Sequence, residues 1–260
     1  MNTTDIEFVN DLVQRAGQIA LESSPEDWNI EYKGPGDAVT ALDHQLSELI
    51  VSELKSRFPD DGIISEEITA SPEEWAHSRV WIIDPIDGTR HFINGNGEWA
   101  VMVGLLVNSV PVFGWVYRPT KDYLYFGGKD HGAFRQCDHT TIQFGLCSQK
   151  IPPIIMAGGR DPIRSKIDNL WKGTRIIRRG SMGLKVMAIL DGEADLAIQS
   201  DVHSKQWDTA APMAIGMECG LVAIGLNGKP LRYGTDELSH LNGVLIGLPL
   251  TCDEVAARLQ

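Results

Sequence analysis

The chain has 260 residues, a hydrophobic content of 43% and a formal net charge of −12, which is enough apolar sequence for one large domain or two packed halves. Such an acidic chain argues against nucleic-acid polymers and anionic membranes as partners, because both attract clustered Lys and Arg. No run approaches the roughly 18–20 apolar residues of a membrane span, and the first residues lack an export signal, so we expect a cytoplasmic location. The four cysteines are widely spaced without a Cys-x-x-Cys pair, which predicts reduced thiols rather than a zinc site or a disulfide framework.

The first half of the chain is predicted to form helices followed by a sheet. Apolar residues at helical spacing over residues 5–22, behind a polar Thr3-Thr4-Asp5 cap, indicate an amphipathic helix, and a second helix begins near Thr40. Short apolar runs separated by Gly, Pro and Asn then predict strands. Their ranges are 62–65, 80–84, 99–107, 112–117 and 123–126.

The second half alternates between strand and helix patterns, which predicts helices layered against a sheet. The expected strands are 154–157, 175–177 and 195–199, and the expected helices are 161–171, 184–190 and 209–218. A soft boundary near residues 146–153 divides the chain into an α+β half, 1–148, and an α/β half, 149–260. The fold class predicted from these patterns is therefore layered α/β.

The most specific motif is Trp81-Ile82-Ile83-Asp84-Pro85-Ile86-Asp87-Gly88-Thr89-Arg90-His91-Phe92. Its apolar start predicts a buried strand that Pro85 ends, so that Asp84 and Asp87 project from the carboxyl end, where open α/β sheets bind ligands. Gly88 would let a phosphate approach the next backbone amides, which form a helix amino terminus if residues 88–92 are helical. A polar turn after a strand is the alternative for Asp-Pro alone, but the complete Asp-Pro-x-Asp-Gly-Thr pattern is far more specific.

Two further acidic sites fit the same chemistry. Glu66 and Glu67 follow a short apolar strand, and Asp208 lies at or just before the start of a helix. Taken alone, the glutamates could be solvated surface charge and Asp208 could be an N-cap. Together with Asp84 and Asp87 they offer only oxygen ligands, which suit Mg2+ and favour a two-metal site for phosphoryl transfer to water.

These motifs resemble those of the inositol monophosphatase superfamily of lithium-sensitive, Mg2+-dependent phosphatases, over nearly the whole chain. The matching segments are 64–67, 81–92 and 207–211. The resemblance implies an α-β-α-β-α sandwich that hydrolyses small phosphate esters with water and without a covalent phosphoenzyme. It places most metal ligands in residues 1–148. Residues 149–260 would cover the substrate site and supply the last carboxylate ligand. Lithium inhibition is a further expectation.

The resemblance also implies a ligand set for two or three Mg2+ ions. The ligands of one ion would be Glu66, Asp84 and the backbone carbonyl of Ile86. The ligands of a second ion would be Asp84, Asp87 and Asp208, so that Asp84 bridges the two ions.

Catalytic roles follow from the same resemblance. Asp43 would pair with Thr89 to orient the attacking water, and Glu67 would hold an outer water or a weaker third ion. A charge at a helix amino terminus is the alternative role for Asp43. His91 could be proposed as an acid, but a surface or supporting histidine is favoured.

The choice of substrate depends on other segments. Residues 92–99, 179–185 and 227–233 resemble the bacterial CysQ-type 3'(2'),5'-bisphosphate nucleotidases more than the inositol-selective members, and Gln199 stands where the latter carry a glutamate for ring hydroxyls. We therefore expect hydrolysis of 3'-phosphoadenosine 5'-phosphate to AMP and phosphate, which clears a by-product of sulfate assimilation. The alternatives are an inositol or broad sugar phosphatase, including one for fructose 1,6-bisphosphate, and a catalytically silent regulatory paralogue. The silent paralogue is disfavoured because all the expected metal-ligand residues are present.

Substrate contacts are expected from the metal motifs and from small-residue turns and cations in the second half. The residues are Glu66, Asp87, Gly88, Thr89, Arg160, Gly180, Ser181, Lys185 and Asp208. Among the cations, Lys185 and Arg160 are favoured over Arg178 and Arg179 because each of the two follows a small-residue turn, and for each cation singly a solvated surface charge stays an equal alternative. A homodimer stays open, because the sequence does not reveal the oligomeric state.

Overall fold

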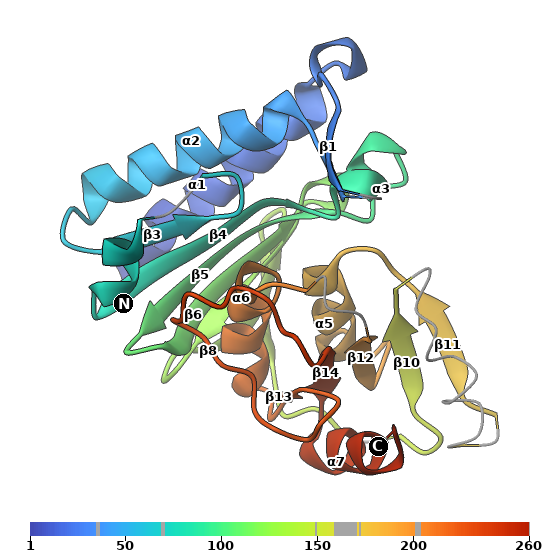
Figure 1. Cartoon of the computed structure of the whole chain (residues 1–260). Coiled ribbons are helices and arrows are strands. Elements are labelled where there is room, and N and C mark those ends of the chain that lie inside the picture. Colours follow the sequence, from blue (N-terminus) through green and yellow to red (C-terminus); the bar gives the residue numbers. More distant parts are fainter. Residues whose placement is uncertain are drawn as a thin grey trace.

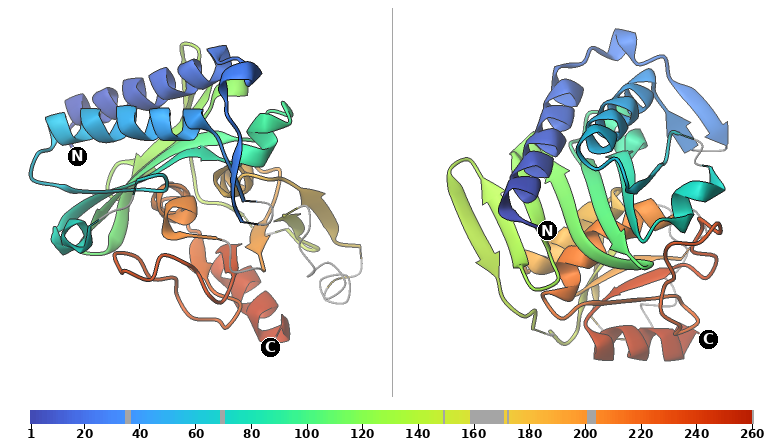
Figure 2. Two further views of the ribbon diagram at one scale, coloured as in Figure 1. Left: turned by 45° about the horizontal axis from the view of Figure 1, so that its top comes forward. Right: turned by 90° about the vertical axis from the view of Figure 1, so that its left-hand side faces the viewer.

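The computed structural model describes residues 1–34, 37–68, 71–148, 150–158, 171, 173–200 and 204–259. The two larger sheets and the helices stack in alternating layers (Figures 1 and 2). Helices α1 (Thr3–Glu22) and α2 (Ala41–Arg57) cover one sheet. Helices α5 (Met182–Leu190) and α6 (Gln206–Met217) fill the space between the two sheets, and α7 (Pro249–Leu259) covers the outer face of the second. The predicted layered α/β class and α-β-α-β-α sandwich are thus confirmed.

The outer helices of the first half are α1 (Thr3–Glu22) and α2 (Ala41–Arg57). Helix α2 begins next to Thr40 as predicted, and Thr40 is its N-cap. The cap of α1 is Asn2, whose side chain accepts a hydrogen bond from the Asp5 backbone nitrogen at 2.8 Å. The predicted Thr3-Thr4-Asp5 cap was therefore wrong, because those residues already form the first helical turn. Between the two helices lie the 3-10 turn η1 (Pro25–Asp27) and a small hairpin of β1 (Glu31–Gly34) and β2 (Asp37–Val39).

The larger sheet has seven strands in sequential order, of which only the first two run parallel. Its strands are β3 (Gly62–Ser65), β4 (Arg79–Asp87), β5 (Ala100–Val107), β6 (Val110–Arg118), β7 (Tyr123–Gly128), β8 (Gly132–Cys137) and β9 (Thr140–Phe144). Short helical segments interrupt it at η2 (Pro72–Ala76), α3 (Thr89–Ile93) and η3 (Pro119–Lys121). Strands β8 and β9 were not predicted because most of their residues are partly or fully exposed and lack an apolar run.

The smaller sheet has five strands in the order β11-β10-β12-β14-β13. They are β10 (Ile154–Ala157), β11 (Arg175–Arg178), β12 (Leu196–Gln199), β13 (Val222–Ile224) and β14 (Val244–Gly247). The helices of this half are α5 (Met182–Leu190), α6 (Gln206–Met217) and α7 (Pro249–Leu259). The helix predicted at 161–171 lies outside the described residues except for position 171. None of the helices in the described part of the chain has the length and apolarity to span a bilayer.

The cores follow the alternation of side chains along each strand. On β4, Trp81 and Ile83 are buried beneath α1 and α2, whereas Val80 and Ile82 face the opposite way, towards α6. Because side chains on a strand alternate between its faces, the next even position, Asp84, also points towards α6. The buried apolar run therefore aims the first motif carboxylate into the layer between the two sheets.

Helix α6 packs directly against the backbone of the larger sheet at two glycines that face it. Gly104 and Gly114 are cross-strand partners on β5 and β6, and a Cβ on Gly114 would lie 2.1 Å from the carbonyl oxygen of Ala211 in α6. Any side chain there would overlap the helix backbone. This glycine pair lets the first turn of α6, which carries Asp208, sit directly over the end of β4.

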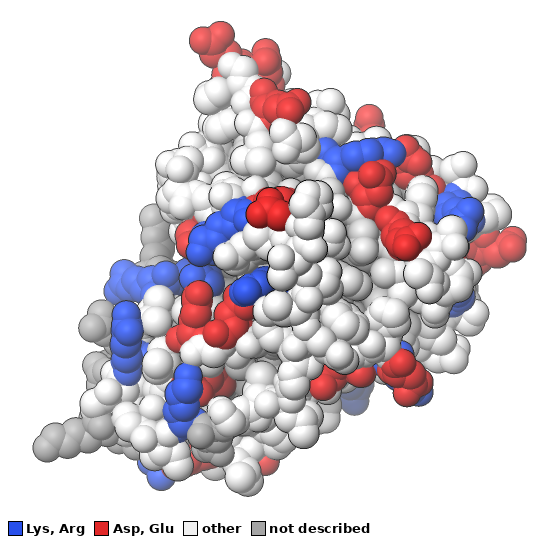
Figure 3. Space-filling model, turned by 180° about the vertical axis from the view of Figure 1, so that it is seen from behind, with Lys and Arg blue, Asp and Glu red and all other residues white. Residues whose placement is uncertain are grey.

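Acidic and basic side chains are intermingled on one face of the molecule. Figure 3 shows Lys and Arg lying among Asp and Glu on the face opposite to that of Figure 1. Surface ion pairs such as Arg15 with Glu53, 2.7 Å apart, and Arg57 with Asp5, 2.8 Å apart, use part of the positive charge. Among the residues drawn in colour, that face does not present the one-signed basic surface that nucleic-acid binding requires.

Candidate active site

Strand β4 continues through Pro85 to Asp87, so the prediction that Pro85 ends the strand was wrong. Asp84 lies opposite Met102 and Asp87 lies opposite Ala100, so three steps along β4 match two steps along β5. This is a β-bulge, whose extra residue needs no ladder hydrogen bond and so tolerates a proline. Without the extra residue, two side chains three positions apart would point to opposite faces. The bulge instead turns both carboxylates towards α6.

Asp208 approaches the bulge from the other half of the chain. Helix α6 starts at Gln206, with Lys205 at the N-cap position, so Asp208 lies in the first turn and is not the N-cap. The Lys205 backbone nitrogen donates to Asp208 Oδ2 at 2.7 Å, which fixes the direction of the carboxylate. The second carboxylate oxygen is left to point towards β4.

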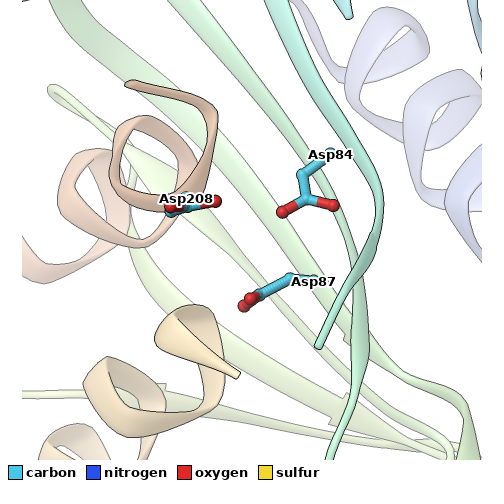
Figure 4. Close-up of side chains that lie close together, drawn as sticks. All are labelled: Asp84, Asp87 and Asp208. Atoms are coloured by element: carbon cyan, nitrogen blue, oxygen red, sulfur yellow. The ribbon is translucent and has the colours of Figure 1, made fainter. Parts of the chain in front are cut away.

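The three aspartates form one cluster, in which Asp84, Asp87 and Asp208 each have a carboxylate oxygen within 4.8 Å of those of the other two (Figure 4). Burial raises the pKa of Asp84 well above its ordinary value, and the charges of Glu66, Asp87 and Asp208 add to this effect. Burial also raises the pKa of Asp87, and burial together with the charge of Asp87 raises the pKa of Asp208 to about 7. Burial at all three carboxylates and repulsion at Asp84 and Asp208 both disfavour the charged forms, which a nearby cation would stabilise.

A hard divalent cation fits these residues. Asp84 Oδ1 is buried and has no hydrogen-bond partner, which is costly for a carboxylate unless another ligand is present. The donors are all oxygens, and such sets favour Mg2+, Ca2+ or Mn2+ over zinc or copper. A cation between Asp84, Asp87 and Asp208 would supply the missing partner and remove the repulsion.

Asp87 is held in place by the amino terminus of α5. Its Oδ2 accepts hydrogen bonds from Ser181 Oγ at 2.5 Å and from the Gly183 backbone nitrogen at 2.7 Å, and its Oδ1 accepts from the Met182 nitrogen at 3.1 Å. Ser181 Oγ also accepts a hydrogen bond from the Leu184 nitrogen at 3.0 Å, so the same hydroxyl caps α5 and binds Asp87. Ser181 was predicted as a substrate contact, and the structure places it, fully buried, against a predicted metal ligand.

Asp43 makes a contact that fits each of the two roles the sequence left open, and its part in orienting a water stays a prediction. Its Oδ2 accepts from the Thr40 backbone nitrogen at 2.8 Å in a capping box at the start of α2, and its Oδ1 lies 3.2 Å from Thr89 Oγ1. The Thr89 hydroxyl also lies 3.1 Å from the Ile86 carbonyl oxygen, the predicted backbone ligand. Burial, with a contribution from the charge of Glu67, raises the pKa of Asp43 to about 6. The predicted Asp43 and Thr89 pair is therefore in contact beside the bulge.

The two glutamates lie at the edge of the aspartate cluster. Glu66 follows β3, which pairs in parallel with β4, and its charge reaches Asp84 although it is not one of the three clustered carboxylates. Glu67 Oε2 lies 3.9 Å from His44 Nε2 of α2. Gly88, between β4 and α3, has a φ of 97°, a left-handed conformation that favours glycine and starts the short helix predicted there.

Lys185, predicted as a substrate contact, is more deeply buried than that role requires. It is 1% exposed on α5, and its ammonium donates to Gln199 Oε1 at 2.7 Å. The two positions that the sequence singled out for specificity are therefore in contact with one another. A direct contact of Lys185 with substrate stays a prediction, and Arg160 lies outside the described residues.

A junction between the halves was missed by sequence reasoning. Glu98, after α3, pairs through Oε1 with Arg118 at 2.8 Å and through Oε2 with Arg179 at 2.9 Å. Next to Arg179, Gly180 packs against His91, where a Cβ would lie 1.9 Å from the imidazole ring. The only signal was the Arg179-Gly180-Ser181 turn, because the partners lie some eighty residues earlier in the chain.

Comparisons with known proteins agree with this geometry. A model of the inositol monophosphatase family matches residues 1–248. The chain is 35% identical over 235 residues to inositol monophosphatase 2 of Rattus norvegicus, which covers 85% of this chain and 79% of the rat protein. It is 30% identical to inositol monophosphatase 1 of Sus scrofa over 86% of this chain and 84% of that protein.

Solved structures show the same fold. The IMPase of Thermotoga maritima superposes with a TM-score of 0.82 at 24% identity, over 99% of this chain and 97% of its own. CysQ of Bacteroides thetaiotaomicron, a bacterial member of the inositol monophosphatase family, superposes with a TM-score of 0.79 at 25% identity, over 95% and 97% of the two chains. The expected closeness to the CysQ type stays a prediction, since the sequence relatives named above are inositol monophosphatases. From the family model and these relatives, the chain belongs to the inositol monophosphatase family.

Proposed function

We propose that this chain is a phosphatase that uses Mg2+ and water to hydrolyse a small phosphate monoester. The observation that carries the proposal is the cluster of buried Asp84 and Asp87 with half-buried Asp208, in which Asp84 Oδ1 has no hydrogen-bond partner. These three carboxylates would hold Mg2+ with Glu66 and the carbonyl of Ile86. When bound, Mg2+ lowers the pKa of a water molecule and stabilises charge on the phosphoryl group.

The remaining residues would position the water and the carboxylates. Asp43 accepts the hydrogen bond of Thr89, so this pair can fix the orientation of an attacking water and accept its proton. Ser181 and the first amides of α5 hold Asp87, so that its ligand geometry does not depend on the substrate. Glu67 would hold an outer water or a third ion.

As the substrate we propose 3'-phosphoadenosine 5'-phosphate, whose removal would serve sulfur metabolism. The support is the contact between Lys185 and Gln199. A glutamate at position 199 would add a negative charge beside the Lys185 ammonium, whereas the amide adds none, and the more positive local charge favours a substrate with a second anionic group. The structural likeness to CysQ at 25% identity points the same way.

Inositol monophosphate is the second candidate. It is favoured by the relatives at 30–35% identity, which are inositol monophosphatases of mammals. The discriminating experiment is a comparison of kcat/KM for the nucleotide, inositol 1-phosphate and fructose 1,6-bisphosphate with Mg2+. Preference for either of the other two esters would overturn the nucleotide assignment, and no turnover of any ester would favour the silent regulatory protein.

Gln199→Glu sharpens the comparison. If the Lys185 charge serves a second phosphate, the variant should lose about ten- to a hundredfold in kcat/KM for the nucleotide, because a charged contact contributes about 1.5–3 kcal/mol. Hydrolysis of inositol 1-phosphate should not fall with it. The matched control is Gln143→Glu on the exposed strand β9, which should change neither rate. An equal loss for both esters would contradict the specificity role.

A further inference from the structure

Two cysteines from distant parts of the chain meet beside the middle layer. Cys147 lies in the connection between β9 and β10, which leads from one sheet to the other, and Cys219 follows the end of α6. The Cys147 backbone nitrogen donates to the Cys219 carbonyl oxygen at 2.9 Å. One such bond limits the Cα separation to about 7 Å, which is within reach of a disulfide bond. Both cysteines are free thiols in this structure.

The two thiols differ in acidity and in exposure. Their mutual interaction lowers the pKa of the Cys147 thiol, whereas this interaction together with burial raises the pKa of the Cys219 thiol. Cys219 is fully buried, whereas Cys147 is half-buried and lines a cleft of about 210 Å3 together with Lys150, Leu190 and Asp195. An oxidant can therefore reach Cys147 but not Cys219. Reactive cysteines combine this partial exposure with a depressed pKa and a nearby second thiol.

We propose that Cys147 and Cys219 form a reversible disulfide when the protein meets a peroxide. The Cys147 thiolate attacks one peroxide oxygen, which breaks the O–O bond and gives a sulfenic acid and one molecule of water from hydrogen peroxide. The Cys219 thiol then attacks the Cys147 sulfur, the S–S bond forms, and the sulfenic oxygen leaves as a second water. Two thiols are oxidised and one peroxide is reduced to two waters. A small dithiol restores both cysteines.

The bond would add a covalent link between two segments that are joined by a backbone hydrogen bond and by packing. It would link the connection between the two sheets to the end of the helix that begins with Asp208. Cys147 Sγ also lies 4.0 Å from the Ile189 carbonyl oxygen of α5, so both helices of the middle layer border the bond. Closing this long loop removes freedom from the unfolded chain, so oxidation should raise the thermal midpoint by on the order of 5–10 °C.

The test is peroxide treatment of the full chain, followed by intact mass, thiol counting, peptide mapping and thermal unfolding. We expect two of the four thiols to disappear, a mass loss of about 2 Da and a linked peptide pair containing Cys147 and Cys219. Dithiothreitol should reverse the thiol loss and the rise in midpoint. None of these readouts uses phosphatase activity, so failure here leaves the proposed function untouched.

Variants separate pairing from general oxidation. Cys147→Ser should abolish the linked pair and the rise in midpoint, while Cys137→Ser, at a partly exposed thiol of β8, should leave both unchanged. Wild-type protein that gains oxygen on Cys147 without pairing, or that pairs Cys137 instead, would overturn the proposal. The peptide map of the wild type decides the matter even if a serine variant folds poorly.

Discussion

Asp208→Asn should stabilise the metal-free protein, although it removes a predicted metal ligand. In the folded chain the pKa of Asp208 is raised from 3.8 to about 7, mainly by burial. The stability that its protonated form contributes is therefore complete below pH 3.8 and is lost as the pH rises through about 7. Asparagine stays neutral over this range and can still accept the Lys205 hydrogen bond. The advantage of the variant should grow with pH and level off above neutrality.

The magnitude follows from the size of the rise in pKa. A change from 3.8 to about 7 corresponds to at most about 4 kcal/mol, because each pKa unit is worth 1.36 kcal/mol. Asp208 is partly exposed, so solvent screening reduces this to about 2 kcal/mol. Without metal the variant should unfold about 4–8 °C above wild type at pH 8 and roughly half as far above it at pH 5.5.

In the presence of Mg2+, wild type should become more stable than Asp208→Asn. A ligand at one hundred times its dissociation constant adds about 2.7 kcal/mol to the folded state, and only wild type has the complete carboxylate cluster. The assay is thermal unfolding at both pH values, in EDTA and in millimolar Mg2+, with exposed Asp236→Asn as the control. Equal midpoints for variant and wild type in EDTA at pH 8, or equal stabilisation of both by Mg2+, would refute this reasoning.

Three further predictions concern the supports of the site. Gly114→Ala should lower the free energy of unfolding by about 1–3 kcal/mol, because the added methyl group overpacks against Ala211, and it should weaken Mg2+ binding by displacing α6. The control is Gly145→Ala, whose added Cβ has nothing within 4 Å and which should not change stability in denaturant unfolding. Ser181→Ala should lower the free energy of unfolding by about 1–2 kcal/mol, and it should lower the Mg2+ affinity measured by calorimetry because Asp87 loses a hydrogen bond that holds it. Unchanged affinity would show that the α5 backbone amides alone hold Asp87 in place. Thr89→Val should reduce kcat by about a hundredfold with KM and Mg2+ affinity nearly unchanged, and an equal loss through KM would instead indicate substrate binding.

Local patterns predicted much of the fold because the apolar residues follow the period of each element. The start of α2 at Thr40 and the limits of β3 were right for this reason. Strands β13 and β14 and helix α7 were not predicted, and the polar strand β9 carried no apolar run. The division at residue 148 stays a prediction.

The site was predictable in its residues but not in its geometry. The motif named Asp84 and Asp87, yet whether both face α6 depends on a bulge that forms only when β4 pairs with β5. In the same way, the contact of Asp87 with Ser181 and that of Lys185 with Gln199 join elements that local sequence does not relate. Such long-range contacts depend on the packing of the two sheets, which periodicity does not specify.

The carboxylate cluster is tested most directly by phosphate release with and without Mg2+, in wild type and in Asp84→Asn, a substitution in the buried residue that would bridge the ions. The protein should hydrolyse a phosphate monoester only when Mg2+ is present, and the variant should lose turnover while its circular dichroism stays that of wild type. Full activity in EDTA, or full activity in a folded Asp84→Asn protein, would contradict a Mg2+ site at the end of β4.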